Sequence, residues 1–188
     1  METGSPQEIR EVLEAGPRPG VGYLPTLSLD DVPRLTEEQG IAPQDLKRAR
    51  QAELAMHIMA LANGPSAWGE WRYLVIGARE SGELSNLLPG TINNDMLQQI
   101  LHRYCEPTPS CYYREGRVGG QRLGMVVIND SAMKPFRFVC DVEYEQAGRR
   151  ELAYRKGEIW VQENGQPRLA SAEEAIQLKL DAALVKPR

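Results

Sequence analysis

Residues 53–83 constrain the fold of this chain more than any other segment. They contain the end of an apolar helix, the pair Asn63-Gly64, a loop and the apolar run 72–77. The helix is expected to span 43–62, and because apolar residues cover most of its circumference in the later turns, it should be buried on more than one side. Asn-Gly followed by proline is typical of a helix end, and a near-continuous apolar run indicates a central strand covered on both faces. The sequence therefore predicts a buried helix followed by a buried strand.

The rest of the chain divides into helical and extended segments. An N-terminal helix should begin at Ser5-Pro6 and stop at Gly16, and an amphipathic helix should cover 92–104, where apolar residues recur every fourth position. A capping box at Ser171–Glu174 indicates the start of a last helix. Because helices and strands are partly segregated, the predicted fold class is α+β with a mixed, mostly antiparallel sheet. Strands are predicted at 111–114, 121–129, 136–144, 151–155 and 159–161.

Residues 1–42 differ in composition from the remainder of the chain. Glycine and proline are concentrated between positions 17 and 35, which indicates an extended arm that crosses the surface after the first helix. Residues 43–188 are expected to form one domain, because 188 residues of which 41% are hydrophobic can build a single core. The arm is a candidate contact for a protein partner or for a second copy of the chain.

Charge and cysteine content limit the classes of function. The net charge is −4 and the isoelectric point is near 5.4, so nucleic-acid binding would need a local basic patch. Cys105, Cys111 and Cys140 lack CxxC spacing, which favours reduced thiols in a cytoplasmic protein over a disulfide framework or a zinc site. No stretch approaches the roughly 18 apolar residues of a membrane span, and the polar, acidic N-terminus is unlike a secretory signal. We therefore expect a cytoplasmic protein without a membrane segment.

A series of short motifs in fixed order covers about residues 43–180. The series begins with Ala60-Leu61-Ala62-Asn63, a loop and Leu74-Val75-Ile76-Gly77. The later motifs are Pro107-Thr108-Pro109, Met125-Val126-Val127-Ile128, Ser131-Ala132-Met133-Lys134-Pro135-Phe136 and Tyr154-Arg155-Lys156-Gly157. In this order and spacing the motifs resemble the Schlafen/AlbA-like DNA-binding domain family. The resemblance implies nucleic-acid binding and, as in some members, metal-dependent cleavage of RNA, including transfer RNA.

Cleaving members of the family carry three carboxylates, because a divalent metal needs hard oxygen ligands to polarise a phosphate and activate water. The resemblance assigns Asp45 and Glu80 to two of these positions, with Lys47 beside Asp45. The third acid is absent from its expected place, and Glu37 or Glu38 is close but out of register. Arg79 replaces a further acid, so the centre is expected to be degenerate. A degenerate centre would need no cofactor, whereas an active nuclease would bind Mg²⁺ or Mn²⁺. The alternative interpretation of Asp45, Lys47 and Glu80 is a cluster of charged side chains on the surface.

Basic and aromatic residues supply the candidate nucleic-acid contacts. Arginine suits bidentate contact with phosphate oxygens, although nearby glutamates make ordinary solvation an equal alternative. Trp68 and Trp71 could stack on unpaired bases or anchor their loop on the core. A second basic group lies at Arg114, Arg117 and Arg122. The predicted phosphate-binding residues are Arg149, Arg150, Arg155, Lys156 and Arg168.

These observations support three hypotheses. The first is a nucleic-acid-binding module that favours RNA or single strands and has a degenerate nuclease centre. The second is a metal-dependent endoribonuclease that uses Asp45, Glu80 and either Glu37 or Glu38 and acts on structured RNA such as tRNA. The third is a protein-interaction subunit of a larger, for example defence-related, complex.

Overall fold

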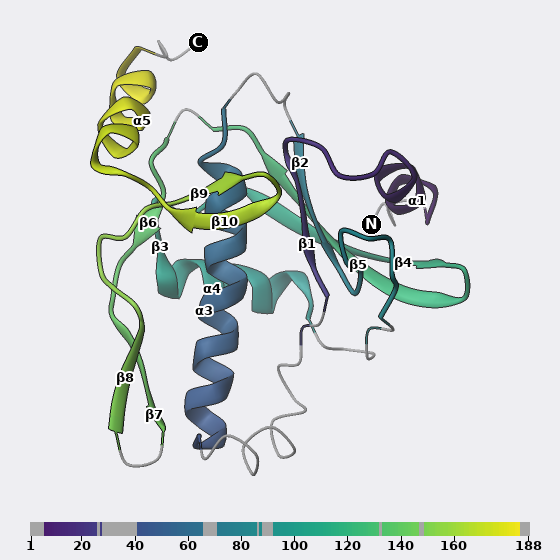
Figure 1. The fold of residues 1–188 in the computed structure, drawn as a ribbon, viewed down its shortest axis with the longest axis horizontal. Coiled ribbons are helices and arrows are strands. Elements are labelled where there is room, and N and C mark those ends of the chain that lie inside the picture. Colours follow the sequence, from purple (N-terminus) through teal and green to yellow (C-terminus); the bar gives the residue numbers. More distant parts are fainter. Residues whose placement is uncertain are drawn as a thin grey trace.

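The computed structural model describes residues 6–25, 27, 41–65, 71–85, 87, 92–131, 133–146 and 149–184. The fold is α+β, as predicted, with a mixed main sheet and small hairpins (Figure 1). The helices are α1 (Pro6–Glu14), α3 (Pro43–Ala62), α4 (Asn94–Tyr104) and α5 (Ala172–Leu184). The strands are β1 (Val21–Leu24), β2 (Trp71–Ile76), β3 (Cys105–Glu106), β4 (Cys111–Val118), β5 (Gln121–Asn129), β6 (Arg137–Phe138), β7 (Val142–Gln146), β8 (Arg149–Tyr154), β9 (Trp160–Glu163) and β10 (Gln166–Leu169).

The main sheet has the strand order β1-β2-β5-β4. Strand β1 runs parallel to β2, whereas β2 with β5 and β5 with β4 are antiparallel. Because side chains alternate along a strand, each strand contributes to two faces. Leu74, Ile76 and Val126 pack in the core that contains α3, whereas Val75 and Met125 pack with α1 on the other face. We call this second face the outer face.

Helix α3 lies at the centre of the structure (Figure 1). It contacts the main sheet through β2 and β5 and contacts β7, β9 and β10 on its other side. Leu54, Ala55 and Ile58 are fully buried, as the apolar circumference of the sequence predicts. The bounds Pro43–Ala62 agree with the predicted helix.

The N-terminal segment corrects one expectation. Residues 17–35 were expected to cross the surface as an extended arm, but Val21–Leu24 forms β1, and all four of its residues are buried. Helix α1 packs against β4, and Ile9 is almost completely buried on the outer face. Val21–Leu24 is drawn into the sheet because a parallel partner strand satisfies the backbone N–H and C=O groups along this edge of β2. The division of the chain at residue 42 stays a prediction.

Two hairpins and the last helix complete the fold. The predicted strand 136–144 is divided into β6, which pairs with β3, and β7, which pairs with β8. Strands β9 and β10 are joined by Asn164-Gly165, whose φ values of 49° and 81° are those of a two-residue hairpin turn. The capping box of α5 is present, with Ser171 and Glu174 each bonded to the other's backbone N–H. Among the helices described, none has the length and apolar character that a membrane span requires.

Candidate functional site

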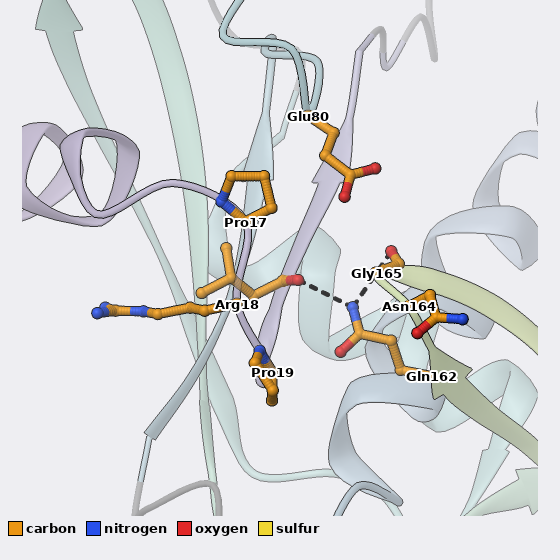
Figure 2. Close-up of a pocket in the computed structure, with 8 residues that line it drawn as sticks. Pro17, Arg18, Pro19, Glu80, Gln162, Asn164 and Gly165 are labelled. Carbon is orange, nitrogen blue, oxygen red and sulfur yellow. Dashed lines mark hydrogen bonds between the residues drawn. The ribbon is translucent and has the colours of Figure 1, made fainter.

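Glu80 borders two neighbouring cavities on the edge of the fold. The first, which we call the Glu80 cavity, has a volume of about 430 Å³ and lies between the N-terminal segment and the β9–β10 turn. Figure 2 shows its lining residues. The second, which we call the His57 cavity, has a volume of about 400 Å³ and includes Tyr23, Glu53 and Arg79 with His57 and Glu80.

The β9–β10 turn positions the Glu80 cavity. Gln162 Nε2 donates to the carbonyl oxygens of Val21 at 2.9 Å and Gly165 at 3.3 Å, which ties the hairpin to β1 (Figure 2). A Cβ atom at Gly165 would lie 3.1 Å from Glu80 Oε1. Glycine is therefore favoured at position 165 by its left-handed backbone, and a larger residue would also have to displace the Glu80 carboxylate.

Two titratable groups in the His57 cavity have shifted pKa values. The pKa of Tyr23 is raised, first by burial and then by the Glu80 carboxylate, while Arg18 acts in the opposite direction. The pKa of His57 is lowered because burial disfavours the charged imidazolium, although the Glu53 carboxylate acts to raise it. Glu53 and His57 are one helical turn apart on α3. Their i, i+4 spacing is a sequence signal that could have predicted this pair, which was not among the predicted site residues.

The lowered pKa of His57 predicts a pH dependence of stability. The unfolded chain, with an ordinary histidine pKa of about 6.5, binds this proton more readily than the folded chain. The free energy of unfolding should therefore fall as the pH decreases below about 6.5, by at most about 1.4 kcal/mol per pH unit for one proton. Urea unfolding between pH 7.5 and 5.5 measures this slope. His57→Gln should remove it, and His102→Gln, a substitution at an exposed position, should not. An unchanged slope in His57→Gln would contradict the assignment.

The structure places Asp45 away from Glu80. Asp45 forms an ion pair with Arg48 at 2.6 Å and accepts a 3.3 Å hydrogen bond from the backbone N–H of Glu145. It lines a separate cavity of about 280 Å³ beside the β7–β8 hairpin. The His57 cavity, one of the two that Glu80 borders, instead touches α3 at Glu53 and His57, roughly 12 and 18 Å further along the helix axis at 1.5 Å per residue.

The remaining candidates for the metal site give no further ligand near Glu80. Lys47 is exposed on the first turns of α3, and Glu37 and Glu38 lie outside the described residues. Within the described ranges, no group of three or more His, Cys, Asp or Glu side chains could hold a metal ion. The assignment of Asp45 and Glu80 to one metal site therefore stays a prediction from the resemblance alone.

The predicted basic residues lie along β8 and β10. Arg149, Arg150, Arg155 and Lys156 are all exposed. Arg150 lies 3.8 Å from Glu143 and lines the same cavity as Asp45. Arg149, Arg155 and Lys156 have no side-chain ion pair among the described residues.

Arg168 differs from the other four cations. Its guanidinium is held by Glu163 at 3.0 Å and by Glu174 at 2.6 Å. This contact lowers the pKa of Glu174 to about 2. Through Glu174, Arg168 links β10 to α5. Because two carboxylates already hold its guanidinium, Arg168 has less freedom to contact a phosphate.

The second basic group is largely neutralised within the protein. Arg114 forms an ion pair with Glu8 of α1, and Arg122 forms one with Glu115 on the neighbouring strand. Arg117 is exposed near the β4–β5 turn. The three arginines therefore do not form one free basic patch.

Comparison with known proteins gives the fold. No model of a known protein family matches the chain, and no curated protein matches it in sequence. The crystal structure of the DIP2311 protein from Corynebacterium diphtheriae is similar, with a TM-score of 0.52 and 15% identity over 93% of this chain and 32% of that chain. This chain thus spans about a third of that protein's length. The solution structure of the N-terminal domain of a protein related to the ATP-dependent DNA helicase RecG, from Nitrosomonas europaea, gives a TM-score of 0.39 and 15% identity over 90% of this chain and 96% of that one.

Proposed function

We propose that this protein is a nucleic-acid-binding module of the Schlafen/AlbA-like type that favours RNA or single strands. The observation that carries the proposal is the exposure of Arg149, Arg155 and Lys156, which have no ion pair among the described residues. Such cations attract phosphates, because neutralising a phosphate releases condensed counterions. Arg150 and Arg168 would contribute less, since each lies within ion-pair distance of a carboxylate.

The arrangement of these cations suits a backbone rather than a point ligand. In the described part of the chain β8 pairs only with β7, so its outer edge is open. Arg149 begins β8, and Arg155 and Lys156 directly follow it, so they are separated by roughly 20 Å at 3.3 Å per residue. This span exceeds a single phosphate group and fits several phosphates of one strand.

The proposed activity is binding without cleavage. Asp45 and Glu80, the carboxylates that the family resemblance assigns to a metal, line separate cavities. If Mg²⁺ or Mn²⁺ bound at one of these carboxylates, it would supply a Lewis acid there. The protein-interaction hypothesis loses part of its proposed surface, because residues 21–24 of the arm are buried in the main sheet.

The test is the binding and integrity of labelled transfer RNA and labelled single-stranded DNA, with manganese or with a chelator. We expect a mobility shift without cleavage, and an affinity that falls steeply with salt. The variant R149A/R155A/K156A should lose affinity and reduce the slope of log K against log[salt] by about 2, at roughly 0.7 for each phosphate contact on a single strand.

A second triple variant controls for net charge. R103A/R137A/K179A removes the same charge from exposed positions outside β8, and it should leave the slope nearly unchanged. Equal effects of the two variants would refute the β8 site. Cleavage that requires manganese and is lost in Glu80→Gln would replace the proposal with the endoribonuclease hypothesis. Absence of any shift would refute nucleic-acid binding.

A further inference from the structure

The outer face of the main sheet carries a group of aromatic side chains, of which Trp71 is exposed and Tyr73 and Tyr112 are partly buried. Trp71 and Tyr73 lie on β2, and Tyr112 lies on β4. The register places Tyr73, Val127 and Tyr112 in one row across β2, β5 and β4. Trp71 occupies the next row, opposite Asn129. Although α1 covers part of this face, 45% of Trp71 is exposed, so an indole is available to a ligand here.

Trp71 and Tyr112 lean toward each other above β5. Strands β2 and β4 are the two neighbours of β5, so their backbones are roughly 9.6 Å apart. The two ring centroids are nevertheless only 6.3 Å apart, with an interplanar angle of 75°. Asn129 Oδ1 is buried and makes no hydrogen bond within the described structure. The two rings therefore meet edge to face above β5, and we call this aromatic pair the Trp71–Tyr112 surface.

Cations surround this aromatic surface. The Arg114 guanidinium lies 4.6 Å from the centre of the Tyr112 ring, a cation–π contact. Figure 2 shows that the Arg18 side chain points away from Glu80 and Asn164. Val21 pairs with Tyr73, and the Tyr73 N–H donates to the Gly20 carbonyl oxygen at 2.9 Å, so the segment that carries Arg18 runs beside the start of β2. The pKa of Tyr73 is raised by burial, by Glu8 and by Tyr112, and is lowered by Arg18 and Arg114.

The local charge favours an anionic ligand. Glu8 neutralises Arg114, but Arg18 is exposed and has no carboxylate within ion-pair distance in the described part of the chain. An exposed indole with a cation nearby combines a stacking platform with a contact for phosphate.

We propose that the outer face binds a single-stranded nucleic acid by stacking an unpaired base on Trp71, at the end of the Trp71–Tyr112 surface, with Arg18 beside the phosphate backbone. A duplex hides the faces of its bases in the helical stack, so the proposal applies to unpaired bases. It rests on the proposed nucleic-acid binding and adds a second surface, which lies on the opposite side of α3 from the β7–β8 hairpin (Figure 1).

The experiment measures binding of a fluorescein-labelled oligonucleotide of about eight thymidines, within the usual range of single-strand site sizes, to the full chain by fluorescence anisotropy. W71A should weaken binding about tenfold or more, the usual effect of removing one stacking aromatic. W71F keeps a stacking ring and should stay within about threefold of wild type. L169A removes an exposed apolar side chain from β10, away from the outer face, and should have no effect. An unlabelled duplex should compete poorly.

The outcomes separate this inference from the proposed function. If W71A binds like wild type while R149A/R155A/K156A loses affinity, the outer-face site is overturned and nucleic-acid binding stands. If W71A and W71F lose affinity equally, or if the duplex competes as well as the single strand, stacking is overturned. If wild type binds neither the oligonucleotide nor transfer RNA, both proposals fail. Thermal unfolding of W71A like that of wild type confirms that a loss of affinity is local.

Discussion

Asn63→Ala should lower the free energy of unfolding by about 3 kcal/mol or more, at about 1 kcal/mol or more for each of three backbone groups left without a partner. Asn63 is only 2% exposed and connects three segments. Its Nδ2 donates to the carbonyl oxygens of Phe136 and Trp160, both at 2.9 Å. Its Oδ1 accepts from the backbone N–H of Phe136 at 2.8 Å. Urea unfolding at pH 7, followed by circular dichroism, measures the change.

Asn94 provides a matched control for Asn63. It bonds the N–H and C=O of Tyr113 as Asn63 bonds those of Phe136, but Asn94 is exposed at the start of α4. Water can replace its hydrogen bonds, so Asn94→Ala should cost much less, about 1 kcal/mol. Equal losses in the two variants would contradict the assigned role of burial. Asn63→Asp should also be destabilised at pH 7, because its carboxylate would face two carbonyl oxygens, and should recover in part as the acid is protonated.

The position of Asn63 shows how far the sequence predicts this fold. The Asn-Gly pair correctly predicted the end of α3, because helix ends are determined by local backbone geometry. The pattern of local residues could not show that the Asn63 side chain bonds Phe136 and Trp160, which are 73 and 97 residues further along the chain. Asn164-Gly165, by contrast, is a strong local signal for a two-residue hairpin. It was available in the sequence and would have predicted β10 as the hairpin partner of β9, a strand that was predicted at 159–161.

The candidate site was less predictable than the fold for the same reason. Strand β1 is a four-residue segment between glycine and proline residues, and its pairing with β2 depends on the whole sheet. The local pattern of glycine and proline predicted a surface arm for this segment, and the family resemblance predicted Asp45 as the carboxylate partner of Glu80. In the structure the neighbours of Glu80 are Tyr23, on β1, and the Glu53–His57 pair of α3. Asp45 lies in the first turn of the 20-residue helix α3, two to three turns before Glu53 and His57.

Asp130→Ala should destabilise the protein by about 3 kcal/mol, the lower end of the usual cost of removing one partner from a buried ion pair, because the Asp130 side chain itself is 27% exposed. Asp130 Oδ1 accepts hydrogen bonds from Arg72 Nη2 and Lys134 Nζ, both at 2.9 Å. The Arg72 side chain is completely buried and that of Lys134 is 8% exposed. Burial is the main reason that the pKa of Lys134 is lowered, and Arg72 lowers it further. Without Asp130, two buried cations would face each other beside the carbonyl oxygen of Gly64.

A double-mutant cycle distinguishes this charge effect from a loss of packing. Arg72→Met introduces an apolar side chain of similar length and leaves Asp130 paired with Lys134. It should therefore lower the free energy of unfolding by less than Asp130→Ala does. In the double variant R72M/D130A the repulsion between the two cations is absent. We therefore expect R72M/D130A to be more stable than D130A, with a coupling energy within the roughly 0.5–3 kcal/mol found for interacting residues. A charge effect requires that removing Arg72 relieves part of the stability lost in D130A. If the losses of the two single variants, measured by urea unfolding, simply add in the double variant, Asp130 acts through packing or through its other contacts.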